Sequence, residues 1–206
     1  MFNINFQDLV IQIPVFLFAL TIHEFSHGYV AMLCGDQTAR MQGRLTMNPL
    51  KHLDPLGTLA IFLIHFGWAR PVPVDPRNFR NPHRDMILVS LAGPMSNLAT
   101  MIVSLFALIA MAYFGRGMPD FLAQPIIAML SVSIWINSIL AIFNMIPIPP
   151  LDGSKVLMGL LPPKQARYIA RMEGAGFILI MILAFTGMLG KFIVFVQSLL
   201  FSFFTG

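Results

Sequence analysis

The sequence predicts an all-α polytopic membrane protein with about five full transmembrane helices, a re-entrant segment and a small β-hairpin beside a candidate site. Two features of composition indicate this class: 57% of the residues are hydrophobic and only 11% are charged, and the mean hydropathy is +0.77. A soluble domain of this composition would expose more apolar surface than water tolerates. The third feature is a series of apolar runs long enough to cross about 30 Å of hydrocarbon as helices. We expect one membrane-embedded domain over residues 1–206, with a core at 6–153 and a C-terminal helical hairpin at 165–206.

The first predicted span covers residues 6–33 and contains the sequence HEFSH, an H-E-x-x-H pattern. On a helix, His23 and His27 are one turn apart, so both imidazoles can hold one metal ion while Glu24 handles a proton. A polar cluster that only caps or bridges helices is the alternative. Ionisable side chains in an apolar span are costly and usually functional, which favours the metal site. His23 lies roughly 16 Å inside the exit face at 1.5 Å per residue, so the site is expected within the membrane.

The region from residue 36 to residue 85 is rich in Pro, Gly and Arg and holds only short apolar pieces. The run Leu56–Phe66 covers about 17 Å as a helix, which is too short to cross and suits a re-entrant segment. The stretches Ala39–Thr46 and Trp68–Val74 alternate loosely and are compatible with β-structure, so we expect a small hairpin or paired edge strands. Three histidines here lack ligand spacing and are interpreted as solvated or hydrogen-bonded loop residues: His52, His65 and His83.

The second predicted span, Met86–Phe114, carries the segment LAGPMSN in its first third. Gly93 and Ser96 provide a small-residue face for close helix approach, and Asn97 at that depth needs a hydrogen-bond partner. Helix packing alone is one interpretation. The other is a role in holding the substrate or a ligand of the site, and on that interpretation Asn97 is a candidate substrate-binding residue.

The third predicted span, Gln124–Met145, is followed by three prolines within residues 147–150, which cannot continue a helix. Unwound backbone at membrane depth is tolerated only where it lines a cavity or is buried in protein, so this stretch is expected to form a wall of the site. Asp152 is the obvious acid to complete the metal site. It could instead cap a helix that starts near Ser154.

Two shorter apolar segments, Ile169–Phe185 and Phe192–Phe204, are predicted to form a helical hairpin that serves as scaffold or gate. The net charge is +4, but the thirteen Lys and Arg form no basic stripe, which argues against nucleic acid as a partner. If Leu56–Phe66 re-enters the membrane, eleven of the thirteen lie on one side, in residues 36–85 and 147–173. The positive-inside rule then places the N-terminus outside and the site open toward the cytoplasm.

Three motifs in this order resemble the site-2 protease family of intramembrane zinc metalloproteases. The HEFSH segment is similar to its zinc motif, LAGPMSN to its Gly-containing central motif, and Phe143–Gly153 to its Asn…Asp-Gly motif. Asn48-Pro49, the segment Asp54–Thr58 and Gly67–Val74 further resemble the minimal prokaryotic branch, which carries neither PDZ nor CBS domains. The resemblance covers nearly the whole chain.

The resemblance implies that His23, His27 and Asp152 hold Zn²⁺ and that Glu24 is the general base for a zinc-activated water. It also implies that Asn144 contacts the substrate, through an amide that could pair with the peptide backbone or the developing oxyanion. The expected function is an intramembrane endopeptidase of regulated intramembrane proteolysis. Its partners would be a transmembrane protein substrate and the lipid bilayer of a prokaryotic plasma membrane, with no nucleic acid and no covalent cofactor.

Two other functions remain open at this point. A zinc transporter would place His and Asp in membrane helices, but it normally offers repeated ligand sets along a path and does not need Glu24 as a base. A non-catalytic membrane scaffold is the other alternative, which the intact ligand set argues against. The variant Glu24→Gln discriminates the protease from the transporter.

Overall fold

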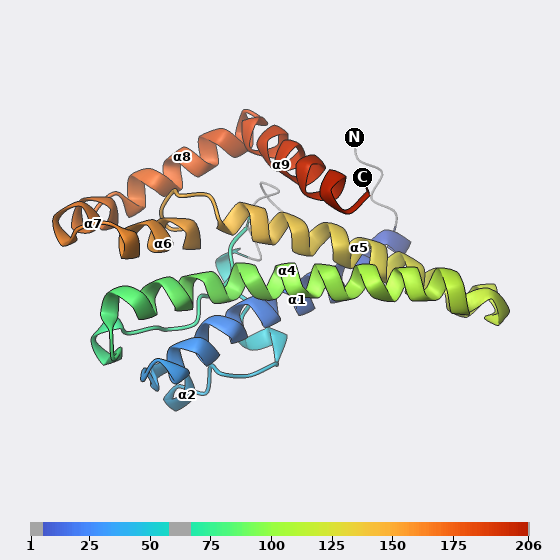
Figure 1. Cartoon of the computed structure of the whole chain (residues 1–206), viewed down its shortest axis with the longest axis horizontal. Coiled ribbons are helices and arrows are strands. Elements are labelled where there is room, and N and C mark those ends of the chain that lie inside the picture. Colours follow the sequence, from blue (N-terminus) through green and yellow to red (C-terminus); the bar gives the residue numbers. More distant parts are fainter. Residues whose placement is uncertain (1–5, 58–66, 206) are drawn as a thin grey trace.

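The computed structural model describes residues 6–57 and 67–205, and its regular elements are helices (Figure 1). The α-helices and 3₁₀-helices (η) in chain order are α1 Phe6–Leu33, α2 Thr38–Met41, η1 Pro49–Lys51, η2 Pro76–Asn78, α4 Pro82–Phe114, η3 Gly115–Gly117, α5 Asp120–Asn144, α6 Asp152–Leu160, α7 Pro163–Ala170, α8 Glu173–Phe185 and α9 Met188–Thr205.

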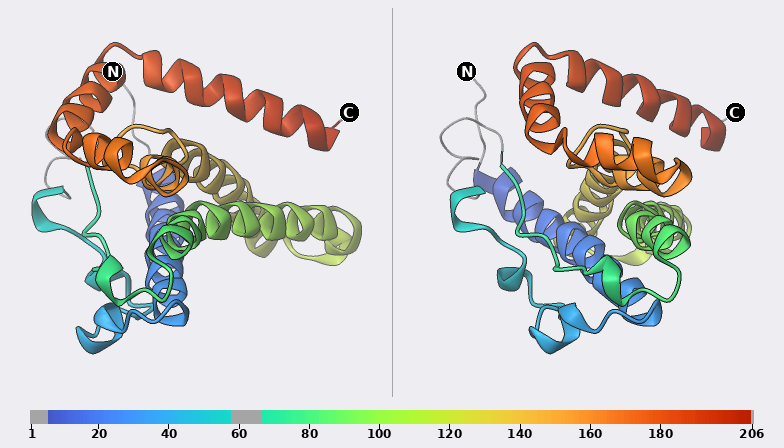
Figure 2. Two further views of the ribbon diagram at one scale, coloured as in Figure 1. Left: turned by 60° about the vertical axis from the view of Figure 1, so that its left-hand side comes forward. Right: turned by 90° about the vertical axis from the view of Figure 1, so that its left-hand side faces the viewer.

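The centre of the fold is α4, which packs against α1, α5 and α6. Helices α4 and α5 run side by side along the long axis of the molecule, and α1 crosses them at a steep angle (Figures 1 and 2). Helix α9 packs against α5 and α8, and both α8 and α9 lie on the side of the molecule away from α2 (Figure 1). Because α1 touches both α4 and α5, side chains from its middle turns enter the inside of the bundle.

Three helices are long and apolar enough to cross a membrane: Leu9–Leu33, Pro82–Phe114 and Asp120–Asn144. They correspond to the three predicted spans, and α1 has the predicted bounds. The C-terminal part differs from the prediction. Helices α7 and α8 meet at a bend of 58° and count as a fourth span only if they are taken together. With 13 residues, α8 alone reaches about 20 Å, which is short of a full crossing.

The predicted number of five full spans is therefore too high for the described residues, which offer three or at most four. Helix α9 is an apolar helix of intermediate length, Met188–Ser202 in its apolar part. The re-entrant prediction for Leu56–Phe66 falls almost entirely on residues 58–66, which lie outside the described residues.

The predicted β-hairpin is not present in the described part of the chain. Residues 39–41 of the first predicted strand, Ala39–Thr46, belong instead to the short helix α2. The second, Trp68–Val74, is extended but is joined to another segment only by a single antiparallel bridge between Ala69 and Leu53. Its prolines explain why no ladder forms: Pro71 and Pro73 have no N–H group to donate.

The loops on the α2 side of the molecule are tied together by the buried carboxylate of Asp36, just after α1. Gly35 makes the turn there with a φ of 113°, a backbone conformation that suits glycine. Asp36 accepts hydrogen bonds from the backbone amides of Thr38 and Asp75, at 3.0 and 2.8 Å, and from the side chain of Asn78 at 2.9 Å. This one carboxylate thus fixes the end of α1 against the chain that leads into α4.

Candidate metal centre

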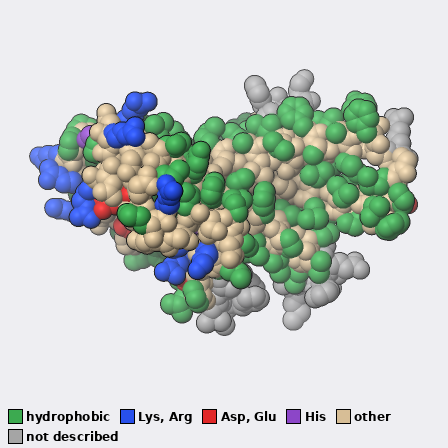
Figure 3. Space-filling model, turned by 90° about the horizontal axis from the view of Figure 1, so that it is seen from below, with side chains coloured by type: hydrophobic (Ala, Val, Ile, Leu, Met, Phe, Trp, Pro, Cys, Tyr) green, Lys and Arg blue, Asp and Glu red, His purple; other side chains and the backbone are tan. Residues whose placement is uncertain are grey.

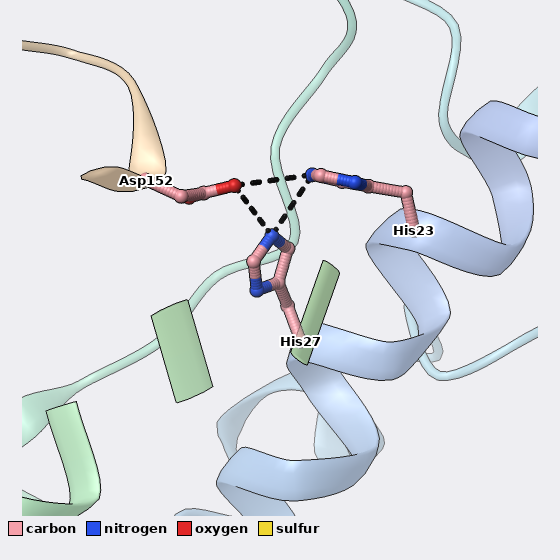
Figure 4. Close-up of side chains that lie close together, drawn as sticks. All are labelled: His23, His27 and Asp152. Carbon is pink, nitrogen blue, oxygen red and sulfur yellow. Dashed lines mark hydrogen bonds and ion pairs between the residues drawn. The ribbon is translucent and has the colours of Figure 1, made fainter. Parts of the chain in front are cut away.

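The middle of α1 presents two histidines on one face. His23 and His27 are both buried and lie one turn apart, so the helix directs both rings to the same side. The rings meet edge to face with centroids 4.6 Å apart, and their Nε2 atoms are 3.0 Å apart. Both Nε2 atoms point toward the start of α6 (Figure 4).

The third member of the cluster, Asp152, comes from the first turn of α6. Its Oδ2 lies 3.2 Å from Nε2 of His23 and 3.1 Å from Nε2 of His27 (Figure 4). Its other oxygen, Oδ1, accepts a hydrogen bond of 3.2 Å from Nζ of Lys155. The non-helical, proline-rich residues 145–151 turn the chain back from α5 so that Asp152 reaches α1. Capping does not describe its role, because the N-cap residue is Leu151 and no side chain caps this helix.

The ligand atoms of this cluster carry lone pairs that face one another. His27 Nδ1 lies 2.7 Å from the carbonyl oxygen of Val89, which can only accept, so Nδ1 carries the hydrogen and Nε2 of the neutral ring is bare. The ligand atoms of His23, His27 and Asp152 all lie within 4.8 Å of one another. Three such acceptors repel each other unless a cation or proton lies between them.

A zinc ion fits this arrangement. Zinc bonds to nitrogen and oxygen of about 2.0–2.1 Å in a tetrahedral site give ligand–ligand separations of about 3.4 Å, close to the 3.0–3.2 Å between the three atoms. Two imidazoles and one carboxylate are a donor set that zinc prefers. Three protein ligands leave one coordination position open, which is typical of catalytic sites and not of structural ones.

Helix α4 approaches the cluster so closely that only glycine fits at position 93. A Cβ atom there would come within 2.4 Å of Nε2 of His27 and within 2.6 Å of Nε2 of His23. A side chain on Gly93 would therefore occupy the space in which the two ligand nitrogens converge. The small-residue face predicted for this helix is present, and its closest approach is to the histidines themselves.

The predicted base, Glu24, is buried beside the histidines and is held by one of its two oxygens. Its Oε2 accepts a hydrogen bond of 2.8 Å from the backbone amide of Val72. The peptide groups before Val72 are fixed in turn by the buried side chain of Arg44, whose Nη2 donates to the carbonyl oxygens of Arg70, at 2.9 Å, and Pro71, at 3.2 Å. The extended segment Trp68–Val74 thus forms one side of the site.

Two cavities of about 280 Å³ each meet at His23 and Glu24. The first is the more polar and contains the three ligand side chains together with Val72, Ser90 and Lys155. The hydroxyl of Ser90 is buried and has no hydrogen-bond partner among the described residues, so it can bond to a molecule in this cavity. The second cavity is mainly apolar; its lining includes Phe16, Leu20, Trp68, Leu140, Phe143 and Phe177.

The structure separates the two asparagines that the sequence analysis assigned to the substrate. Asn144, the last residue of α5, is partly exposed and borders both cavities, and its Nδ2 donates to the carbonyl of Leu140 at 3.0 Å. Asn97 is fully buried, and its Oδ1 lies 2.6 Å from Nδ1 of His23. Of the two, only Asn144 is placed to meet a substrate.

Sequence reasoning did not identify several residues around the site. Arg44 and Ser90 stand outside the three motifs, and the buried Asn137 of α5, which bonds to Asn97, carries no motif either. A polar amide in the middle of an apolar span was the available signal for Asn137, because such groups must find a partner inside the protein. His52 is buried and lies 2.9 Å from the carbonyl of Thr46, which agrees with its interpretation as a loop residue; His65 lies outside the described residues.

The sequence profile of peptidase family M50 matches residues 107–185 of this chain. The matched segment contains Asn144 and Asp152, while the histidine motif lies before it. No solved structure gives a significant match.

Bacterial proteins named as zinc metalloproteases match most of the chain. The Bacillus subtilis protein YwhC, named as a candidate zinc metalloprotease, is 42% identical over 175 residues, which are 85% of this chain and 80% of that protein. Rip2 of Mycolicibacterium smegmatis, named in the same way, is 28% identical over 186 residues, 88% of this chain and 69% of that protein. Rip2 of Mycobacterium tuberculosis H37Rv is 29% identical over 182 residues, 84% of this chain and 66% of that protein.

Proposed function

Because this chain belongs to peptidase family M50, the family of the site-2 proteases, we propose that it is a zinc-dependent endopeptidase that cleaves peptide bonds within transmembrane segments of other proteins. The observation that carries the proposal is that His23, His27 and Asp152 converge beside Glu24. Both histidines and Glu24 are on α1, a helix long enough to cross a membrane. Zinc bound there supplies Lewis acidity, which lowers the pKa of a water and polarises a carbonyl group.

The carboxylate of Glu24 is the group that moves the proton. It is buried next to the ligand cluster and lines both cavities, so a water and a peptide group can reach it from either side. It takes a proton from the attacking water and passes it to the nitrogen of the leaving amine, as a positioned general base and acid. The bond from the Val72 amide to Oε2 restricts how the carboxylate can turn.

The scissile peptide would lie where the two cavities meet. Asn144 is at this junction with one of its two amide hydrogens engaged by Leu140, so its remaining N–H and its carbonyl oxygen can bond to an unwound substrate backbone. Phe16, Trp68 and Phe177 line the apolar cavity and suit the apolar side chains of a membrane span. The alternative of zinc transport does not explain why a carboxylate is held beside the ligands.

The test is hydrolysis of a single-span membrane protein by the purified full-length chain in liposomes. We expect Glu24→Gln to keep zinc and to lose about 10²–10⁴-fold in cleavage rate, because it removes the general base alone. His23→Ala should lose both zinc and cleavage. Mass spectrometry of the fragments should place the cut inside the span. Wild-type cleavage by Glu24→Gln, or cuts only in the loops of the substrate, would contradict the proposal.

A further inference from the structure

A chain of buried polar side chains leads away from His23 into the bundle. His23 Nδ1 lies 2.6 Å from Oδ1 of Asn97 on α4. Nδ2 of Asn97 donates to the carbonyl of Ala19 at 3.0 Å and to Oδ1 of Asn137, on α5, at 2.9 Å. These bonds link α1, α4 and α5 at the depth of the metal centre, and the two asparagine side chains are fully buried.

The direction of the first bond follows from its neighbours. The carbonyl of Ala19 can only accept, so the atom of Asn97 that faces it must be the amide nitrogen, and the oxygen of Asn97 must face His23. That oxygen also only accepts. The hydrogen of the neutral His23 ring is therefore on Nδ1, and its Nε2 is bare toward Asp152.

The second asparagine secures this orientation from α5. Nδ2 of Asn137 donates to the backbone carbonyl of Ser133 at 2.9 Å and lies 3.2 Å from the Ser133 hydroxyl, so its own oxygen must be the atom that faces Asn97. If Asn97 rotated by 180° about its amide axis, oxygen would face oxygen at both Ala19 and Asn137. The Ser133 hydroxyl continues the chain to Ser104 of α4 at 2.8 Å.

We propose that Asn97 and Asn137 are positioning residues that hold the imidazole of His23 in one tautomer and one orientation, with Nε2 ready for the metal. This proposal rests on the zinc site proposed above. Partners of this kind on the second nitrogen of a ligating histidine contribute about 10–100-fold to metal affinity. The hydrogen bonds of Asn137 among the described residues go to Asn97 and Ser133 and not to His23, His27 or Asp152, so we expect its effect on the metal to pass through Asn97.

The experiment compares the zinc affinity of purified full-length variants by competition with a chromophoric chelator. Asn97→Leu keeps the volume but removes the acceptor, and we expect it to bind zinc about 10–100-fold more weakly. Asn137→Leu should weaken binding in the same direction by a smaller factor. The visible spectrum of the Co²⁺-loaded protein should change in both leucine variants.

Gln197→Leu is the matched control. Gln197 of α9 is also a buried amide, and it donates to Ser138 of α5 at 2.6 Å, but within the described part of the chain it forms no hydrogen bond with Asn97 or Asn137. Its variant should keep wild-type zinc affinity. Equal zinc affinity in wild type and both leucine variants would overturn the proposal, and so would an equal loss in Gln197→Leu. A wild-type protein that binds no zinc would instead refute the proposed function.

Discussion

Single backbone hydrogen bonds determine what the key side chains of the site can do. The Val89 carbonyl leaves Nε2 of His27 bare, and the Val72 amide holds one oxygen of Glu24. Both bonds come from backbone groups, so neither depends on the side chain of Val72 or Val89. Motif reading identifies residue types and therefore finds His27 and Glu24 but not their partners.

The role of the Val72–Glu24 hydrogen bond can be tested by removing the backbone N–H group of residue 72. We expect Val72→Pro to keep zinc and to lower the cleavage rate about tenfold or more, because a hydrogen bond to a charged group is worth about 1.5–3 kcal/mol. Val72→Ala keeps the N–H group and is the control. Cleavage rates and zinc content of both variants decide the matter. Equal cleavage by the Pro and Ala variants would show that this bond does not orient the base.

At the scale of elements, the site depends on how closely α4 approaches α1. Gly93→Ala should reduce zinc affinity at least tenfold, because its methyl group would fill the space between the ligand nitrogens. Gly190→Ala on α9 is the control, since a Cβ atom there meets no atom within 4 Å. Metal analysis after dialysis measures the zinc that each of the two variants retains. Full zinc retention in Gly93→Ala would mean that α4 can shift without disturbing the ligands.

The loops around α2 should respond to acid through Asp36. Burial alone would raise the pKa of this carboxyl, but hydrogen bonds from Thr38, Asn78 and the Asp75 amide outweigh it and lower the pKa below 3.8. A lowered folded-state pKa means that Asp36 stabilises the fold above the pKa of the unfolded chain, and that this contribution is lost as pH falls through the folded-state value.

We therefore expect thermal stability in detergent to decline below about pH 4. Asp36→Asn should be less stable than wild type at pH 7 and should show a smaller decline between pH 7 and pH 3. Thermal unfolding of wild type and variant, followed by circular dichroism at both pH values, gives the four melting temperatures to be compared. An identical decline in wild type and variant would assign the acid sensitivity to other groups.

The sequence was a reliable guide to the long helices and a poor one to the short segments. An apolar run such as residues 6–33 has few alternatives in a membrane, since its backbone must bond to itself. Loose alternation in Ala39–Thr46 carries no such constraint: the Asp36 side chain accepts from the Thr38 amide, and residues 38–41 form a helical turn. Likewise, a 58° bend between α7 and α8 depends on packing that periodicity does not encode.

The whole molecule has an uneven charge distribution. Lys and Arg side chains gather toward one end of the face shown in Figure 3, while apolar side chains cover most of the rest. Eleven of the thirteen basic residues lie in residues 36–85 and 147–173. From this distribution we propose that residues 36–85 and 147–173, and with them the opening of the site, are on the cytoplasmic side.

Cysteine labelling in intact cells tests this orientation. Gln42 and Gln165 are both exposed on the protein surface. In a Cys34→Ser background, we expect the variants Gln42→Cys and Gln165→Cys to be protected by the membrane from an impermeant thiol reagent added outside the cells. A cysteine that replaces Asp120, the exposed first residue of α5, should react. Labelling at Gln42 without labelling at Gln165 would mean that the chain between them crosses the membrane once more than proposed.

The depth of the site within the bundle determines which substrates the proposed protease can cut. His23 lies ten residues before the end of α1, about 15 Å along the helix axis. A substrate span that reaches this depth as a helix has every carbonyl bonded to the amide four residues on, so its backbone must unwind before a water beside Glu24 can attack it. The free energy of that unwinding adds directly to the barrier for cleavage.

Substrates should therefore be cut where their helices are weakest. Gly, Asn or Pro near the scissile bond should favour cleavage, and replacing them with leucines should lower the rate, because leucine is a far better helix former than glycine or proline. Two or three such replacements cost about 2–3 kcal/mol more to unwind, which corresponds to a loss of about 30–150-fold. Leucines placed at the far end of the same span are the control, since they leave the scissile region unchanged. Equal cleavage of the native and the stiffened substrate in liposomes would show that the enzyme does not need an unwound span.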